Sequence, residues 1–72
     1  MENPTYDILD QIAVLGKRGV WTKELNLVRW NNKWDKYDIR DWTSDHMTMS
    51  KGITLTRDEL ITLKSFLEFY EI

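Results

Sequence analysis

Apolar and polar residues alternate along the first part of the chain. Between residues 6 and 15 the even positions are apolar apart from Asp10: Tyr6, Ile8, Ile12 and Val14. A period of two is typical of a strand that is buried on one face. The segment Gly16-Lys17-Arg18-Gly19 then places two glycines around polar residues, which predicts a hairpin connection. We therefore expect a first strand over Tyr6–Leu15.

A second strand is predicted over Val20–Trp30 and a third over Lys36–Trp42. Asn31-Asn32-Lys33 is expected to be the turn between them, because asparagine tolerates the left-handed conformation. In the third strand, Tyr37 and Ile39 fall on one face, and the other face carries Lys36, Asp38, Arg40 and Trp42. One face is thus apolar, and the other, which is cationic and aromatic, is typical of a binding surface.

The rest of the chain predicts a loop over Thr43–Ser50, a short fourth strand over Lys51–Leu55 and a helix over about 57–71. Thr56 and Glu59 have the spacing of a capping box at the start of that helix. Apolar residues form two stripes on the helix: Leu60, Leu63, Phe66, Leu67 and Tyr70 on one side, and Ile61, Phe69 and Ile72 nearly opposite. One stripe can cover the sheet of its own chain. The second predicts a homodimer with Ile61, Phe69 and Ile72 at the interface.

The length of 72 residues fits one domain over residues 1–72 of class α+β, with strands followed by a helix. A chain of this length has a marginal core, and without cysteine it has no disulfide to support it. The longest aliphatic run is Ile12–Leu15, too short for a membrane span. Met1–Pro4 lacks the basic start of a secretion signal, so a cytoplasmic location is expected.

Charge is unevenly distributed along the sequence. The net charge is −2, but residues 17–40 hold seven bases against three acids and three of the four tryptophans. Single-stranded nucleic acid is held by cationic grooves and by aromatic faces on which bases stack. Candidate contacts on the charged face and in the neighbouring turns are Trp30, Lys33, Lys36, Arg40, Trp42 and Lys51. Trp21 and Trp34 fit a place in the core as well as a place on the binding surface.

Catalysis has little support in the sequence. The single histidine, His46, is interpreted as a solvated loop residue, and no nucleophile is paired with a base. Three aspartates, Asp35, Asp38 and Asp41, could bind a metal as in nucleases. Strand alternation sends Asp38 and Asp41 to opposite faces, however, which favours surface pairing with Arg40 or Lys36. We expect no enzyme activity, cofactor or metal.

Several segments together resemble a known family. They are Leu25-Asn26-Leu27-Val28-Arg29-Trp30, Tyr37-Asp38-Ile39-Arg40-Asp41-Trp42 and Lys51-Gly52-Ile53-Thr54-Leu55-Thr56 followed by a helix. The chain resembles the family of the transcriptional coactivator positive cofactor four, in particular its short prokaryotic YdbC-like branch. The resemblance implies a four-stranded curved antiparallel sheet, a C-terminal helix that pairs with its twin in a homodimer, and grooves for single-stranded DNA.

The resemblance also implies roles for individual residues. Trp30 and Trp42 would stack on bases, and Arg40, Lys33 and Lys51 would meet phosphates. Lys23 and Trp21 would be further groove residues. The function so implied is largely sequence-independent binding of single-stranded DNA, with RNA as a second candidate ligand, in transcription, replication or repair, near the nucleoid if the source is prokaryotic. The alternative is a protein-interaction module that binds a peptide or subunit through exposed aromatic residues, and a small nuclease is a third interpretation.

Overall fold

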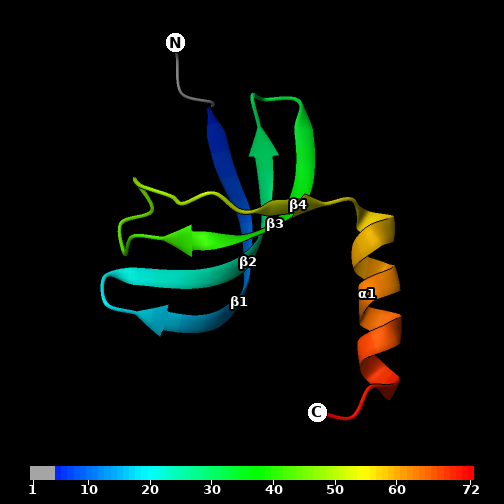
Figure 1. Ribbon diagram of the computed structural model, residues 1–72. Helices are drawn as coiled ribbons and strands as arrows, with labels where there is room; N and C mark the ends of the chain where they lie inside the picture. Colours follow the sequence, from blue (N-terminus) through cyan, green and yellow to red (C-terminus); the bar gives the residue numbers. More distant parts are fainter. Residues whose placement is uncertain (1–4) are drawn as a thin grey trace.

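A computed structural model describes residues 5–72, so the expectation based on Met1–Pro4 concerns residues outside the described part. Four antiparallel strands in the order β1-β2-β3-β4 form one open sheet, and a helix follows (Figure 1). The elements are β1 (Tyr6–Arg18), β2 (Trp21–Trp30), β3 (Trp34–Trp42), β4 (Ile53–Leu55) and α1 (Arg57–Phe69). The predicted sheet and C-terminal helix are confirmed. Within residues 5–72, no helix has the length and apolar character that crossing a membrane requires.

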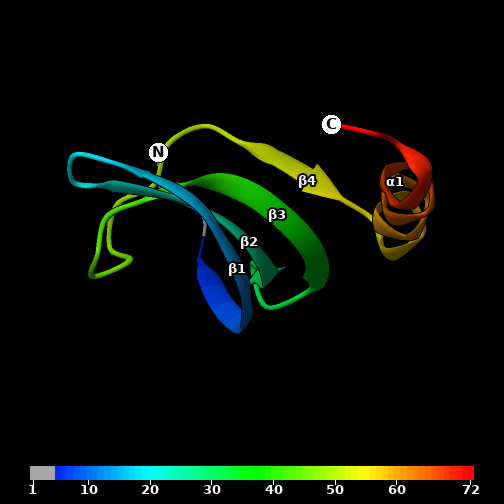
Figure 2. The same ribbon diagram turned by 90° about the horizontal axis from the view of Figure 1, so that it is seen from below.

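The long strands bend strongly, so the sheet is curved rather than flat (Figures 1 and 2). The pairing of β1 with β2 shifts three times, between Ile8 and Asp10, between Gln11 and Ala13, and between Val14 and Gly16. Such shifts are β-bulges, which insert an extra residue into one strand and increase its bend. β1 can therefore follow the curvature of β2 over 13 residues.

The first hairpin turns later than the sequence predicts. β1 continues through Gly16 to Arg18, and Gly19-Val20 alone connects the paired residues Arg18 and Trp21. Gly19 has φ +60°, a left-handed conformation that glycine adopts without steric cost. The second turn is where it was expected, because Asn31 and Asn32 adopt φ of 53° and 59°. This tight turn pairs Trp30 with Trp34, so β3 begins two residues earlier than predicted.

The two faces of the sheet differ in chemistry, as the alternation predicts. We call the face with even-numbered residues of β2 and β3 the tryptophan face; it includes Glu24, Asn26, Val28, Trp30, Trp34, Lys36, Asp38, Arg40 and Trp42. The opposite, aliphatic face includes Leu25, Leu27, Tyr37 and Ile39. Burial is the reverse of what their polarity suggests. Glu24, Asn26 and Asp38 are buried, whereas the four aliphatic-face residues are only half-buried.

The fourth strand is shorter than predicted and lies close to β3. A Cβ atom on Gly52 would come within 2.3 Å of the main-chain oxygen of Ile39 and 2.4 Å of the Cβ of Arg40. Only glycine fits such an approach of two backbones. Thr54 then pairs with Asp38, which places it on the tryptophan face.

Helix α1 begins with the predicted capping box. The Thr56 hydroxyl accepts a hydrogen bond from the Glu59 amide at 3.1 Å, and the Glu59 carboxylate accepts one from the Thr56 amide at 2.7 Å. The helix ends at Phe69, so Ile72 lies beyond it. It stands beside the sheet rather than across it (Figure 2). No helical residue is fully buried and only Leu60 is half-buried, so the expectation that one stripe covers the sheet of its own chain is wrong.

Candidate nucleic-acid interface

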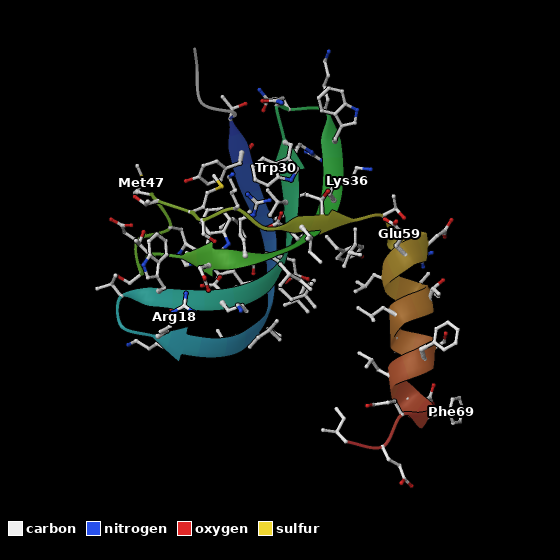
Figure 3. The ribbon with its side chains drawn as sticks, viewed as in Figure 1. Arg18, Trp30, Lys36, Met47, Glu59 and Phe69 are labelled. Atoms are coloured by element: carbon white, nitrogen blue, oxygen red, sulfur yellow. The ribbon has the colours of Figure 1, made fainter. Side chains whose placement is uncertain are left out.

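A pocket on the tryptophan face, beside the turn between β2 and β3, combines aromatic and cationic side chains. Its volume is about 330 Å³, and it is lined by Trp30, Trp34, Lys36, Arg40 and Thr54. The tight Asn31-Asn32 turn brings the two tryptophans together, and strand alternation adds the two cations. Figure 3 shows Trp30 and Lys36 on neighbouring strands in this region. We call it the stacking pocket, because indole faces beside cations suit a base and its phosphate.

Arg40 is held in place by two partners. Its guanidinium lies over the Trp30 ring, 4.9 Å from the ring centroid, and donates two hydrogen bonds of 2.6 Å to the Asp38 carboxylate. Burial raises the pKa of Asp38, although the bonds from Arg40 oppose that shift. The expected pairing of Asp38 with Arg40 is confirmed, but Asp38 is fully buried and Arg40 half-buried, so the pair does not lie on the open surface. Much of the Arg40 charge is therefore neutralised by Asp38.

Lys33 and Trp34 form the exposed rim of the stacking pocket. The Lys33 ammonium lies 5.6 Å from the centroid of the Trp34 ring, and 53% of Trp34 is exposed. Trp34 therefore belongs to the open surface and not to the core, which settles the ambiguity of the sequence. Exposed cation–π pairs of this kind contribute about 0.5–1 kcal/mol, so both groups remain free to meet a ligand.

Trp42 is a core residue, and the expectation of an exposed stacking face is wrong. Its exposed fraction is 0%. The ring packs against Tyr6 and His46, with centroid distances of 5.2 Å and 5.6 Å. Strand alternation places Trp42 correctly beside Arg40, but it carries no information on the strand β1 and the loop 43–50 that cover the ring.

His46 fixes the loop that covers Trp42, so its interpretation as a solvated residue is wrong. Its Nε2 lies 3.0 Å from both carboxylate oxygens of Glu24, and its main-chain oxygen accepts a hydrogen bond from the Tyr6 hydroxyl. Glu24 in turn accepts a hydrogen bond from the Asn26 amide nitrogen at 3.0 Å. Sequence reasoning missed this cluster. The only available signal was that Glu24 and Asn26 share strand parity with Trp30.

The remaining candidate residues lie away from the stacking pocket. Trp21 and Lys23 carry odd numbers in β2 and lie on the side of the aliphatic face. Lys23 lines a separate pocket of about 230 Å³ at the β1–β2 hairpin with Lys17 and Arg18. Lys51 is exposed in the segment before β4. The structure therefore gathers Trp30, Lys36 and Arg40 into one site with Lys33 at its rim, and places the other three apart.

The acidic residues are arranged for ion pairing. Arg29 donates bonds of 2.7 Å and 3.0 Å to Asp35, and this hydrogen-bonded guanidinium holds the pKa of Asp35 below its usual value. Asp41 lies 3.3 Å from Arg18. Within residues 5–72, no group of three or more histidine, cysteine or acidic side chains could hold a metal ion.

Two comparisons place the chain among known proteins. Residues 17–66 match the family model described as Transcriptional Coactivator p15 (PC4). An uncharacterized protein of Treponema pallidum (strain Nichols) is 47% identical over 47 residues, which are 65% of this chain. The aligned region covers 55% of that relative, so the chain spans about half of its length. The matched range 17–66 contains every residue that lines the stacking pocket.

Proposed function

The chain belongs to the Transcriptional Coactivator p15 (PC4) family, and from this premise we propose that it binds single-stranded DNA, as a homodimer and largely independently of sequence. The observation that carries the proposal is the stacking pocket, where Trp30 and Trp34 offer ring faces beside Lys36 and Arg40. Bases of any identity present a π-face, so stacking tolerates every sequence. The proposed setting is transcription, replication or repair, and placement in the YdbC-like branch stays a prediction.

The charge pattern supports a path for the bound DNA strand over the tryptophan face. Lys36 lines the stacking pocket, and Lys33 is exposed at its rim. The charge of Arg40 is mostly neutralised by Asp38, so we propose that Arg40 mainly positions the Trp30 ring. Lys36 and Lys33 are then the main phosphate contacts, Trp30 and Trp34 the stacking residues, and Lys51 an outer contact.

The homodimer is proposed from the exposed apolar surface of one chain. The described hydrophobic residues that are fully buried are only Val28 and Trp42. Helix α1 exposes apolar side chains on more than one side, and the aliphatic face of the sheet is half-open. A second copy would cover both, and it would leave the tryptophan face of each protomer free for DNA.

Titration of a labelled oligo-dT at several salt concentrations tests the proposal. Each phosphate neutralised contributes about −0.7 to the slope of log affinity against log salt on single strands. We expect a steep slope, and Lys36→Gln should reduce it by about 0.7 and weaken all sequences alike. Trp34→Ala should cost about 1–3 kcal/mol of binding free energy without loss of fold.

Lys23→Gln is the matched control, because it removes the same charge from the opposite face of the same sheet. Its effect on affinity should be clearly smaller than that of Lys36→Gln. Equal effects would mean that DNA is held by diffuse charge and not at the stacking pocket. Absence of salt-dependent binding would instead favour the alternative, a module that binds a peptide or subunit through its exposed aromatic residues.

A further inference from the structure

One acidic side chain is fixed close to the stacking pocket, although it does not line that pocket. The ladder between β3 and β4 ends with the pair of Tyr37 and Leu55. The next facing positions along the two strands are therefore Lys36 and Thr56. The Glu59 carboxylate accepts a hydrogen bond of 2.7 Å from the Thr56 amide, so the capping box holds this carboxylate beside the position that faces Lys36.

The carboxylate of Glu59 and the ammonium of Lys36 influence each other. The hydrogen bonds with Thr56 hold the pKa of Glu59 below its usual value, and the nearby charge of Lys36 adds to that shift. Figure 3 shows Lys36 and Glu59 near each other where β4 leads into α1. Because a Coulomb interaction acts on both partners, the ammonium of Lys36 is attracted to a carboxylate even before DNA binds.

Both cations that line the stacking pocket thus have an acidic neighbour, but the two pairs differ. Arg40 donates two hydrogen bonds of 2.6 Å to Asp38, whose side chain is 0% exposed, so a phosphate cannot replace that carboxylate. Glu59 is exposed, and water weakens its attraction for Lys36. A phosphate that enters the pocket can therefore take the place of Glu59 as the partner of Lys36.

We infer that Glu59 is a positioning residue that competes with the DNA phosphate for the Lys36 ammonium and thereby limits how tightly the strand is held. The inference rests on the proposed single-strand binding and adds to it a residue outside the stacking pocket that sets the affinity. Competition for a phosphate contact carries no base information, so it lowers the affinity for every sequence alike.

The variant Glu59→Gln tests this inference by fluorescence anisotropy with a labelled oligo-dT. Glutamine also fits this position of a capping box, so the helix start is kept while the charge is removed. Circular dichroism and urea denaturation check that the fold is intact. The affinity should rise about twofold to fivefold at low salt, the range of an exposed ion pair. The gain should shrink as salt is added, because exposed charges are screened.

Asp58→Asn is the matched control, because it removes one negative charge from the same first turn of α1. The hydrogen bond to the Thr56 amide comes to Glu59 and not to Asp58, so the control should raise the affinity clearly less. Equal gains in the two variants would show a general effect of net charge and would overturn the inference.

The same substitution in a Lys36→Gln background shows whether Glu59 acts through Lys36. If the two groups are coupled as inferred, Glu59→Gln should lose most of its effect there, and a change in the fold alone would not depend on Lys36. A gain of the same size in both backgrounds would mean that Glu59 repels DNA directly, which would overturn the competition for Lys36.

The wild-type titration separates this inference from the proposed function. If the wild type binds oligo-dT and a folded Glu59→Gln variant binds it with equal or lower affinity, the role of Glu59 is overturned and single-strand binding stands. If the wild type does not bind oligo-dT, the proposed function and this inference both fail.

Discussion

At the scale of single residues, the tryptophan face is unusual because it contains buried acidic side chains, Glu24 and Asp38. Burial raises the pKa of Asp38 even though Arg40 donates two short hydrogen bonds to its carboxylate. Arg40 in turn lies over Trp30. Removing the Arg40 charge would leave the Asp38 carboxylate buried and unpaired, which is strongly destabilising. The pair therefore fixes the orientation of the Trp30 ring at the stacking pocket.

The raised pKa of Asp38 predicts an unusual dependence of stability on pH. A carboxyl whose pKa is higher in the folded state stabilises the fold most when protonated, and this contribution is lost as pH rises through the folded pKa. The difference in unfolding free energy between the wild type and Asp38→Asn should therefore fall as pH rises from about 3 to 7. Urea denaturation at several pH values measures it.

Asp35→Asn is the control for that experiment. The pKa of Asp35 is lowered by its hydrogen bonds with Arg29, so the sign is reversed. Its contribution is present above the unfolded pKa and is lost as pH falls through the folded pKa. Parallel slopes for the two variants would contradict the assignment of Asp38 as a carboxyl whose burial outweighs its ion pair.

Trp42→Ala should destabilise the fold by about 3–5 kcal/mol, the usual cost of truncating a buried large aromatic residue. The ring is fully buried against Tyr6 and His46. Urea denaturation measures the loss, and Trp42→Phe gives a measurable value if the alanine variant does not fold. Trp34→Ala should change stability by less than about 0.5 kcal/mol, as is usual for an exposed side chain. Unchanged stability in the Trp42→Ala variant would place that ring at the surface after all.

At the scale of elements, local signals predicted the second turn and the helix start well. The second turn needs left-handed residues, and the capping box is a contact within four residues, so both are visible in the sequence. The bulges of β1 were not predicted, because they depend on how this strand follows its curved partner. The site shows the same division. Strand parity placed Lys36 and Arg40 on one face, but the contact of His46 with Glu24 spans 22 residues and has no local pattern.

Thr56→Ala should lower the stability of the fold by about 0.5–2 kcal/mol, since it removes the hydroxyl that accepts from the Glu59 amide. Urea denaturation and the helical circular dichroism signal measure the effect. Thr62→Ala introduces the same change within the helix and should not reduce stability, because alanine favours helix.

The capping box should also make the helix sensitive to acid. The hydrogen bond from the Thr56 amide lowers the pKa of Glu59, so its stabilisation is present above the unfolded pKa and is lost as pH falls through the folded pKa. A helical signal in the Thr56→Ala variant equal to that of the wild type at every pH would show that the box does not stabilise α1.

At the scale of the whole molecule, one chain leaves much of its apolar surface open. Phe69 is 85% exposed and points away from the sheet at the far end of α1 (Figure 3). Neither stripe of the helix is covered by the described residues of its own chain. The sequence predicted only one uncovered stripe. A second copy remains the simplest cover, because burying each large apolar side chain contributes about 1.5–3 kcal/mol.

Phe69→Glu should shift the protein from twice the chain mass to the chain mass, measured by light scattering, and lower its melting temperature, because folding and association are linked. Lys64→Glu introduces the same acidic residue at a polar helix position and should leave the mass unchanged. A wild-type protein that stays monomeric at micromolar concentration would rule out the dimer.

The three bulges of β1 have a consequence beyond curvature. β1 is an outer strand of an open sheet, and a flat outer strand offers unpaired amides and carbonyls to any strand of another molecule. Bulges interrupt that row, exposed Asp7 and Asp10 add negative charge to it, and β4 on the other side has only three residues. Neither margin of the sheet is a good template for further strands. We therefore expect association to stop at a closed pair instead of continuing into fibrils.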